Sequence, residues 1–570
     1  MRNAWLRVEN KKMKYLLVLL AVGVMALPAV LLRAQEEPGR QVQSVTVNFA
    51  DGSQQQLLPQ GAAAQGIDPH VANPPVCLGI NLEGLRDYDR NFMFIDAMKT
   101  CRRFGTPDRS FDEKARVDAN GWPIEDAGTL VMTDVKNING TYKFFATGRC
   151  EIQVVPGQVR NLNYNERTNR TTADIVVNAP KDQLTTLNMV FRGTGGGLKN
   201  IKLLRPGYDS DAEIFTRQFV RALQPFGAIR FMDYLSTNNS PIKTWDDRAK
   251  PSDATFSTDK GGAYEYAIAL GNIANKDIWL NVPALADDDH VRKLGEMVRA
   301  KLKPNLNCFI EYSNEVWNGQ FQQANQNLEA AKAEVAAGEK TLNDGGRDAN
   351  VYHWHWRRVA KRLVEIKKLM GDDPRIKPVL ASQVGYDPPG TLIKLQLEYV
   401  EKYFGDPKQF LYAVACAPYF SPGMDPADKT NQKWYTQRDD LTVDSICERL
   451  LTCTGSTKSA HVKAFHDLAH RYGIKSFAYE AGLDMQQYKN SLDAKVASNY
   501  DPRMGKALEE YLTNWYQGGG DSLFYFNLNC RYGPFGYWGL TEDSRDLNTP
   551  KYAAAVRVGQ KLKGAGQQAP

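Results

Sequence analysis

The chain has 570 residues, of which 42% are hydrophobic and 24% charged, and its formal net charge is +6. This composition is that of a globular protein and excludes collagen-like, coiled-coil and wholly disordered chains. Six basic residues and one acidic residue lie in the first 34 positions, so the rest of the chain holds 65 basic and 64 acidic side chains, a net charge of +1. Because the positive excess is confined to this leader, we expect no nucleic-acid partner.

Residues 1–34 have the layout of a signal peptide. A basic start is followed by the apolar run Tyr15–Leu32, and the small residues Ala26 and Ala34 each offer a cleavage point. The alternative is an uncleaved anchor, because 18 apolar residues reach the lower limit for spanning a bilayer. We therefore expect an exported protein, secreted or periplasmic, that contacts a membrane only if the leader is retained. A polar linker follows over 35–76.

From residue 77 onward, short apolar runs alternate with amphipathic helical stretches, which is typical of βα units. Parallel strands buried on both faces are continuously apolar, and eight such runs occur: Cys77–Asn81, Ala228–Asp233, Asp277–Pro283, Cys308–Glu315, Pro378–Val384, Leu411–Phe420, Ser476–Gly482 and Ser522–Asn529. Eight βα units predict an α/β fold, a closed (β/α)8 TIM barrel, with an open doubly wound sheet as the alternative. The pattern after the first run predicts a helix over Phe92–Arg103.

The alternation breaks over residues 105–207. Short strand-like runs separated by Gly, Asn and Pro predict a small antiparallel β-sandwich inserted in the barrel, for carbohydrate contact or for support. The barrel is then divided into 77–104 and 208–562, with a tail over 563–570. A second excursion, Gln320–Arg347, is rich in Ala, Gln, Glu and Lys and predicts a helical extension.

The eight cysteines are compatible with an oxidising compartment. Cys447 and Cys453 lie close enough along the chain to suggest a disulfide, and Cys101 with Cys150 is a weaker suggestion. The run Asp287–His290 begins a predicted helix, where acidic side chains favour the positive end of the helix dipole, so we interpret it as a cap and not a metal site. No Cys-x-x-Cys pair and no Gly-rich phosphate loop occur, and we expect no metal and no cofactor.

Two carboxylates fall where predicted barrel strands end. Asn314-Glu315 closes the fourth run, and Glu480 closes the seventh. Strands four and seven lie on opposite sides of an eight-stranded barrel, and its active sites form at the C-terminal ends of the strands, so both carboxylates can converge over the mouth. Paired carboxylates suit the cleavage of a glycosidic bond. The competing interpretation is that a glutamate at a strand end is only the partner in a salt bridge. A second Asn-Glu pair, Asn165-Glu166, is interpreted as solvated surface.

This order and placement resemble the clan A glycoside hydrolases, retaining (β/α)8 enzymes with Asn-Glu at the end of strand four and Glu at the end of strand seven. The resemblance implies that Glu315 is the acid/base, that Glu480 is the nucleophile and that Asn314 hydrogen-bonds the sugar 2-hydroxyl. It also implies that Arg230, ending strand two, hydrogen-bonds the nucleophile. Tyr419, ending strand six, would lie beside the nucleophile.

The chain also departs from the cellulase-like members of that clan. Many carry a histidine two residues before the strand-six tyrosine, where this chain has Ala417, and tend to carry one at strand three, where it has Asn281. A strand-eight tryptophan is not evident, although Trp538 in the following loop can supply it. Because aromatic rings stack on sugar faces, the substrate-binding candidates are Trp538 and Trp317, followed by Trp245 and Trp434. These departures argue against a standard cellulase and leave the sugar open.

Taken together, these features lead us to expect a secreted retaining glycoside hydrolase that cleaves the β-glycosidic bonds of a polysaccharide or oligosaccharide by double displacement. One alternative is a non-catalytic glycan-binding barrel of the cell envelope, in which the carboxylates only grip hydroxyl groups. A further alternative is a structural envelope protein whose β-rich insert is the interface.

Overall fold

The computed structural model describes residues 5–7, 16–17, 45–48, 54–57, 77–343, 350–423, 438–484 and 489–566. The chain divides into two units, Met1–Val71 and Ala72–Pro570. In the first unit four short strands pair antiparallel in the order β2-β1-β3-β4, with bounds β1 (Trp5–Arg7), β2 (Leu16–Leu17), β3 (Val45–Asn48) and β4 (Gln54–Leu57). Apart from β2, the predicted apolar run of the leader lies outside the described residues. Within the described residues, every helix is too short or too polar to cross a membrane.

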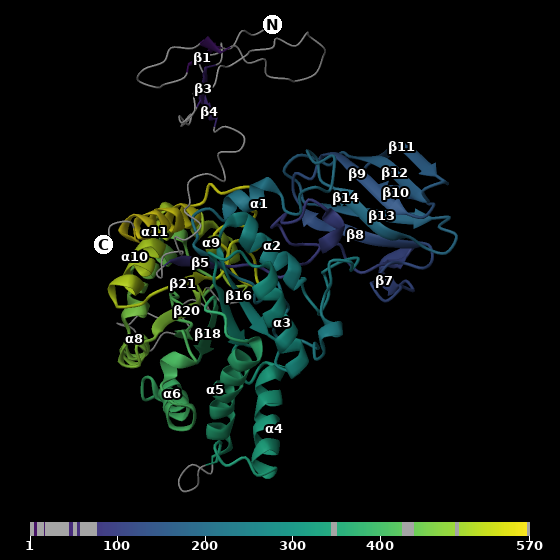
Figure 1. The fold of residues 1–570 in the computed structure, drawn as a ribbon. Coiled ribbons are helices and arrows are strands. Elements are labelled where there is room, and N and C mark those ends of the chain that lie inside the picture. Colours follow the sequence, from purple (N-terminus) through teal and green to yellow (C-terminus); the bar gives the residue numbers. More distant parts are fainter. Residues whose placement is uncertain are drawn as a thin grey trace. The chain divides into compact units, whose positions relative to one another are not determined.

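In the second unit, eight parallel strands close into a barrel, which confirms the predicted (β/α)8 fold and excludes the open sheet (Figure 1). Around the barrel the strands are β15 (Ala228–Arg230), β16 (Asp277–Val282), β17 (Cys308–Tyr312), β18 (Ile376–Ala381), β19 (Ala413–Cys416), β20 (Lys475–Ala481), β21 (Leu523–Tyr525) and β5 (Leu78–Asn81). Nearly every residue of these strands is buried, as strands covered on both faces require.

Large aromatic side chains fill the barrel interior. Trp279, Phe309, Phe477 and Phe524 form one buried cluster, in which the ring centroids of Trp279 and Phe524 lie 4.8 Å apart. Gly79 in β5 faces this cluster, and a Cβ atom there would overlap the Phe524 ring. The interior is therefore packed solid, so the polar residues at the C-terminal strand ends lie above an apolar floor.

Helices cover the outside of the barrel (Figure 1). Their bounds are α1 (Arg217–Ala222), α2 (Tyr264–Ala274), α3 (Asp288–Lys301), α4 (Gln322–Ala336), α5 (Val351–Met370), α6 (Thr391–Phe404), α7 (Val443–Thr452), α8 (Ala460–Arg471), α9 (Leu492–Ser498), α10 (Pro502–Gln517) and α11 (Pro550–Gly566). The helix α4 falls within the predicted extension. Asp287 caps α3 by accepting a hydrogen bond from the backbone N–H of His290, as the sequence suggested.

The helix predicted over Phe92–Arg103 is wrong. That segment holds only the single 3₁₀ turn η2 (Ala97–Thr100). Asp96 forms a β-bridge with Leu204, and its side chain accepts the backbone N–H of Leu203 at 2.9 Å. These tertiary hydrogen bonds outweigh the local helical pattern, because the segment joins the barrel to the end of the insert. The first helix of the barrel is α1, which follows the insert.

The insert is an antiparallel β-sandwich, as predicted, and appears beside the barrel in blue (Figure 1). One sheet has the order β10-β13-β8-β6-β7 and the other β11-β12-β9-β14. The bounds are β6 (Gly105–Thr106), β7 (Arg109–Lys114), β8 (Ala127–Val135), β9 (Gly140–Thr147), β10 (Glu151–Val155), β11 (Gln158–Asn165), β12 (Arg170–Val177), β13 (Thr185–Arg192) and β14 (Lys199–Leu204). A separate apolar core lies between the sheets.

Neither suggested disulfide forms. The Cys447 thiol is free and buried, and Cys453 lies six residues later at the end of the same helix, α7. Six residues of helix rise about 9 Å, beyond the Cα separation that a disulfide can bridge. Cys101 and Cys150 are also free and buried.

Candidate active site

Arg230, the last residue of β15, lies at the centre of a buried network and is 0% exposed. Its Nη1 donates to Glu480 Oε1 at 2.9 Å and to Asn81 Oδ1 at 3.1 Å. Its Nη2 donates to Glu311 Oε2 and to Asn314 Oδ1, each at 2.8 Å. Burial disfavours the cation, but the charges of the two carboxylates outweigh it and raise the pKa of Arg230. The guanidinium thus joins the ends of strands β5, β15, β17 and β20.

Glu311 is a buried residue of this network that the sequence analysis missed. It lies inside β17, where its Oε2 also accepts Trp279 Nε1 at 3.0 Å and Asn281 Nδ2 at 2.8 Å. Burial raises the pKa of Glu311, and the charge of Arg230 opposes that rise. Asn281 is the strand-three position where the sequence lacked the expected histidine. In this chain the amide orients Glu311, which in turn holds the guanidinium of Arg230.

Glu480 lies near the end of β20, and both of its oxygens are engaged. Arg230 contacts Oε1, while the Tyr419 hydroxyl donates to Oε2 at 3.1 Å. Burial and the charge of Glu480 raise the pKa of Tyr419 well above its ordinary value, so the phenol is a neutral hydrogen-bond donor. Glu480 is 7% exposed, with a fixed cation on one oxygen and a fixed donor on the other.

Glu315 follows β17 in a strained turn. Its φ is 41° and that of Ser313 is 55°, a left-handed conformation that costs non-glycine residues energy and recurs at functional sites. The Tyr479 hydroxyl donates to Glu315 Oε1 and Asn318 Nδ2 donates to Oε2, each at 3.0 Å. Burial, followed by the charge of Glu480, raises the pKa of Glu315 to about 7. The two candidate carboxyls therefore lie in different electrostatic environments.

Asn314 is held from both ends of its amide. Its Oδ1 accepts Arg230 and its Nδ2 donates to Asn238 Oδ1 at 3.1 Å. Gln323, near the start of α4, donates to Asn238 Oδ1 at 2.7 Å and to the backbone oxygen of Asn314 at 2.9 Å. The sequence indicated neither Asn238 nor Gln323. Among the described residues the Asn314 amide donates one hydrogen bond, so its second N–H is open to a ligand hydroxyl, and the predicted contact with a sugar stays a prediction.

Trp538 lies at one end of a row of aromatic rings beside Glu480. Its ring centroid is 6.1 Å from that of Phe526, which is 6.5 Å from that of Tyr419. Trp317 follows Glu315 by two residues, is half-buried, and its indole N–H has no hydrogen-bond partner among the described residues. The described contacts thus connect Trp538 to Glu480 only through Phe526 and Tyr419, and Trp317 is close to Glu315 along the chain.

The other two tryptophans do not join this group. Trp245 stacks on Tyr264 at 6.3 Å between centroids, with the guanidinium of Arg248 3.9 Å from its ring centroid, so its faces are covered. Trp434 lies outside the described residues. Within the described chain, no group of three or more His, Cys, Asp or Glu side chains is arranged to hold a metal ion.

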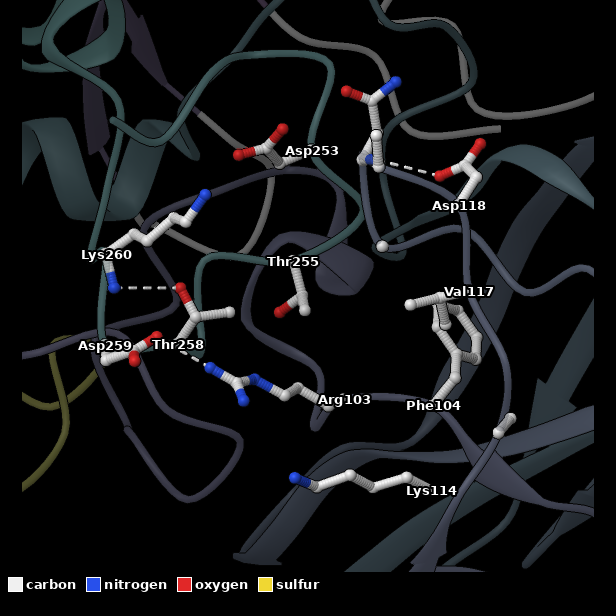
Figure 2. Close-up of a pocket in the computed structure, with 14 residues that line it drawn as sticks. Arg103, Phe104, Lys114, Val117, Asp118, Asp253, Thr255, Thr258, Asp259 and Lys260 are labelled. Atoms are coloured by element: carbon white, nitrogen blue, oxygen red, sulfur yellow. Dashed lines mark hydrogen bonds and ion pairs between the residues drawn. The ribbon is translucent and has the colours of Figure 1, made fainter. Parts of the chain in front are cut away.

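A separate cavity of about 290 Å³ lies where the insert meets the barrel loop before α2 (Figure 2). Figure 2 shows Arg103 extending toward Asp259, with which it forms an ion pair at 2.8 Å. Lys114 and Lys260 line the same cavity, as do Asp118 and Asp253. Its described lining contains none of the predicted site residues, and its cationic and anionic groups are balanced in number.

No protein-family model matches the sequence, and no curated protein matches it. Among solved structures, xylanase 10C of Cellvibrio japonicus in complex with xylopentaose is similar at 10% identity and TM-score 0.31, over 82% of this chain and 98% of that chain. Fungal β-1,4-galactanases are similar at 12% identity and TM-score 0.25, over 52% of this chain and 92% of that chain. XacCel5A in complex with cellopentaose is similar at 13% identity and TM-score 0.31, over 59% of this chain and 87% of that chain. The strand order of the barrel itself, not these similarities, defines the fold.

Proposed function

We propose that the protein is a retaining glycoside hydrolase that cleaves β-glycosidic bonds of a polysaccharide or oligosaccharide, with Glu480 as nucleophile and Glu315 as acid/base. One observation carries the proposal: the half-buried carboxyl of Glu315, just after β17, and the buried carboxyl of Glu480, near the end of β20, have opposite surroundings. Arg230 places a positive charge 2.9 Å from Glu480, while burial and the charge of Glu480 raise the pKa of Glu315 to about 7. Environments that separate two carboxyls in this way assign one to donate a proton and the other to act as an anion.

In the first step, a Glu480 oxygen attacks the anomeric carbon and the bond to the leaving oxygen breaks. Glu315 gives its proton to that oxygen, so the aglycone departs as an alcohol and a glycosyl ester remains on Glu480. Tyr419 and Arg230 hold the two oxygens of Glu480 at 3.1 and 2.9 Å, which fixes the attacking carboxylate in one orientation.

In the second step, Glu315 is a carboxylate and takes a proton from water as the water oxygen attacks the anomeric carbon. The ester bond breaks, Glu480 regains its negative charge and Glu315 regains its proton. Because the Glu480 charge is absent while the ester exists, one of the causes that raise the pKa of Glu315 is then missing, which suits its change from acid to base.

The proposal is tested by incubating the full chain with a panel of β-linked polysaccharides: glucan, xylan, mannan and galactan. We expect new reducing ends from at least one of them, and proton NMR of the first products should show the β-anomer before mutarotation. An α-anomer would exclude double displacement. Binding without reducing ends would favour the alternative of a non-catalytic glycan-binding barrel.

The pH dependence of the reaction tests the assignment of the acid. Glu315 must be protonated before the first step, and its pKa is raised to about 7. We therefore expect kcat/KM to fall about tenfold per pH unit above roughly pH 7. The measurement is kcat/KM between pH 4 and 9, with intrinsic fluorescence at each pH to exclude unfolding. A fall that begins near pH 4.5, the ordinary value for glutamate, would contradict the assignment.

We also propose that the protein acts outside the cytoplasm, either secreted or periplasmic. The support is the order of features in residues 1–34. Basic residues precede an apolar run, and a small residue that can mark a cleavage point lies within the run at Ala26 and another lies after it at Ala34. A polymer too large to cross a membrane would need an exported hydrolase, so this location is consistent with the proposed substrate.

A further inference from the structure

A large cavity extends from the candidate active site toward the insert. Its volume is about 1000 Å³, at the upper end of ligand pockets in proteins and far more than one sugar ring needs. Asp233, three residues after Arg230, lines it together with Phe526 and Asn527, which follow β21 directly. Thr133 and Asp134, in strand β8 of the insert, line its far side. The cavity therefore continues the site and has the insert as one wall.

Hydrogen bonds fix the position of this wall. Arg545 donates to the backbone oxygens of Asn137 and Lys136, each at 2.8 Å, in the turn that follows β8. Arg90 donates to the backbone oxygen of Asp134 at 3.2 Å. The insert is thus tied to the loops that follow β5 and β21, so the cavity has a defined shape.

Exposed aromatic rings line the cavity. Phe535 is 80% exposed and Tyr88 is 50% exposed, although large apolar side chains are normally covered. Trp538 lies deeper, and the ring of Phe526 connects it to Tyr419 beside the nucleophile. Such rings, spaced along the cavity, suit the apolar faces of successive sugar residues.

The described lining is more acidic than basic. Its carboxyl groups belong to Glu83, Asp134, Asp233 and Asp493, and its guanidinium groups to Arg90 and Arg531. Each arginine is already paired with a carboxylate, Arg90 with Glu542 at 3.5 Å and Arg531 with Asp134 at 3.4 Å. Burial raises the pKa of Asp233 to about 7 and that of Glu83 well above its ordinary value, so these two carboxyls are partly or wholly protonated near neutral pH. Within the described lining, an anionic sugar would therefore meet the exposed carboxylate of Asp493 and two arginines that are already paired, with no unpaired cation to receive it.

The position of the acid shows which part of the substrate the cavity faces. The leaving group must lie beside Glu315, which follows β17. The cavity is lined by α9, which follows β20, and by the loops after β21, β5 and β15. These four strands are consecutive in the barrel, on the side away from β17 and β18. It therefore faces the sugar that stays on the nucleophile, and the chain beyond it.

We propose, in an inference that rests on the proposed function, that this cavity binds two or more sugar residues on the non-reducing side of the cleaved bond. It selects uncharged or amino sugars over uronic acids. The substrate is then a chain with a neutral or cationic non-reducing part. The insert is a wall of the binding cleft and not only a support.

The test is calorimetric titration of the Glu480→Gln protein with β-linked oligomers of one to six residues: glucose, xylose, mannose, galactose, glucosamine and glucuronic acid. We expect affinity to rise at least tenfold between one and three residues for one neutral or amino sugar, and glucuronic oligomers to bind at least tenfold more weakly. Equal affinity at every length, best binding by glucuronic oligomers, or binding of none would overturn the proposal.

Two variants locate the binding in the cavity. Phe535→Ala should weaken oligomer binding about tenfold, while Tyr352→Ala, at an exposed aromatic on α5, should not change it. Asp493→Lys should improve glucuronic binding relative to Asp493→Asn. If neither Phe535→Ala nor Asp493→Lys has an effect, the cavity is not the site.

Two outcomes distinguish this inference from the proposed function. Oligomer binding without hydrolysis by the unaltered protein would refute only the proposed function. Hydrolysis of aryl monoglycosides with no gain from longer chains would refute only this inference.

Discussion

Replacing Glu480 with glutamine is expected to lower kcat by about 10⁴-fold or more, while the protein remains folded. Glutamine keeps the shape of the side chain and still accepts the Tyr419 hydroxyl, but it cannot form the glycosyl ester on which double displacement depends. The measurement is reducing-end release from the best polysaccharide of the panel, with initial rates followed long enough to detect a residual 10⁻⁵ of the original activity.

The sequence itself supplies a matched control. Glu166 also follows an asparagine, but it lies in an exposed turn between β11 and β12 of the insert. Glu166→Gln should retain full activity, because the carboxyl is solvated and far along the chain from the barrel strands. Activity of Glu480→Gln within tenfold of the original, with unchanged circular dichroism and melting behaviour, would refute the assignment of the nucleophile.

Residues at strand ends were accessible to prediction because the barrel fixes their positions. Eight continuously apolar runs specify a closed parallel barrel, and a residue that ends a run must then lie at its C-terminal mouth. Arg230, Glu315, Tyr419 and Glu480 come from four separate runs, and hydrogen bonds of 2.9 and 3.1 Å join three of them. Their proximity follows from the topology, although their chemical roles came from a resemblance.

Side-chain contacts between neighbouring strands were not accessible in the same way. Glu311 lies inside the apolar run of β17, and its partners Trp279 and Asn281 belong to β16. Which side chains meet depends on the register of the two strands, which the sequence does not state. One signal was present: an ionisable residue within a buried run must have a partner, so Glu311 could have been paired with a buried cation such as Arg230.

The cavity was predicted least well, because it is assembled from distant segments. Its lining combines loops after β5, β15 and β21 with helix α9 and with strand β8 of the insert. The sequence predicted the insert, yet left open whether it contacts carbohydrate or supports the barrel. Of the cavity residues, only Trp538 was predicted as a substrate contact, because an aromatic in a loop after a barrel strand is recognisable in the sequence. Phe535 was not predicted, because the sequence does not distinguish an exposed phenylalanine from one in the core.

Replacing Arg230 with methionine should destabilise the protein by about 3–5 kcal/mol, the usual cost of removing one partner from a buried ion pair. Glu311 and Glu480 would then be buried together without their shared cation. Burial already raises the pKa of Glu311, and the opposing effect of Arg230 would be lost, so the folded-state pKa would rise further above the unfolded value. The stability of the variant should therefore fall as the pH rises through that pKa, and the loss in free energy of unfolding, measured in urea, should be larger at pH 8 than at pH 5.

The control is Arg103→Met, which removes an exposed ion pair with Asp259. It should lower the free energy of unfolding by less than about 1 kcal/mol at either pH. Equal losses for the two variants, with no dependence on pH, would show that Arg230 does not hold the two carboxylates together.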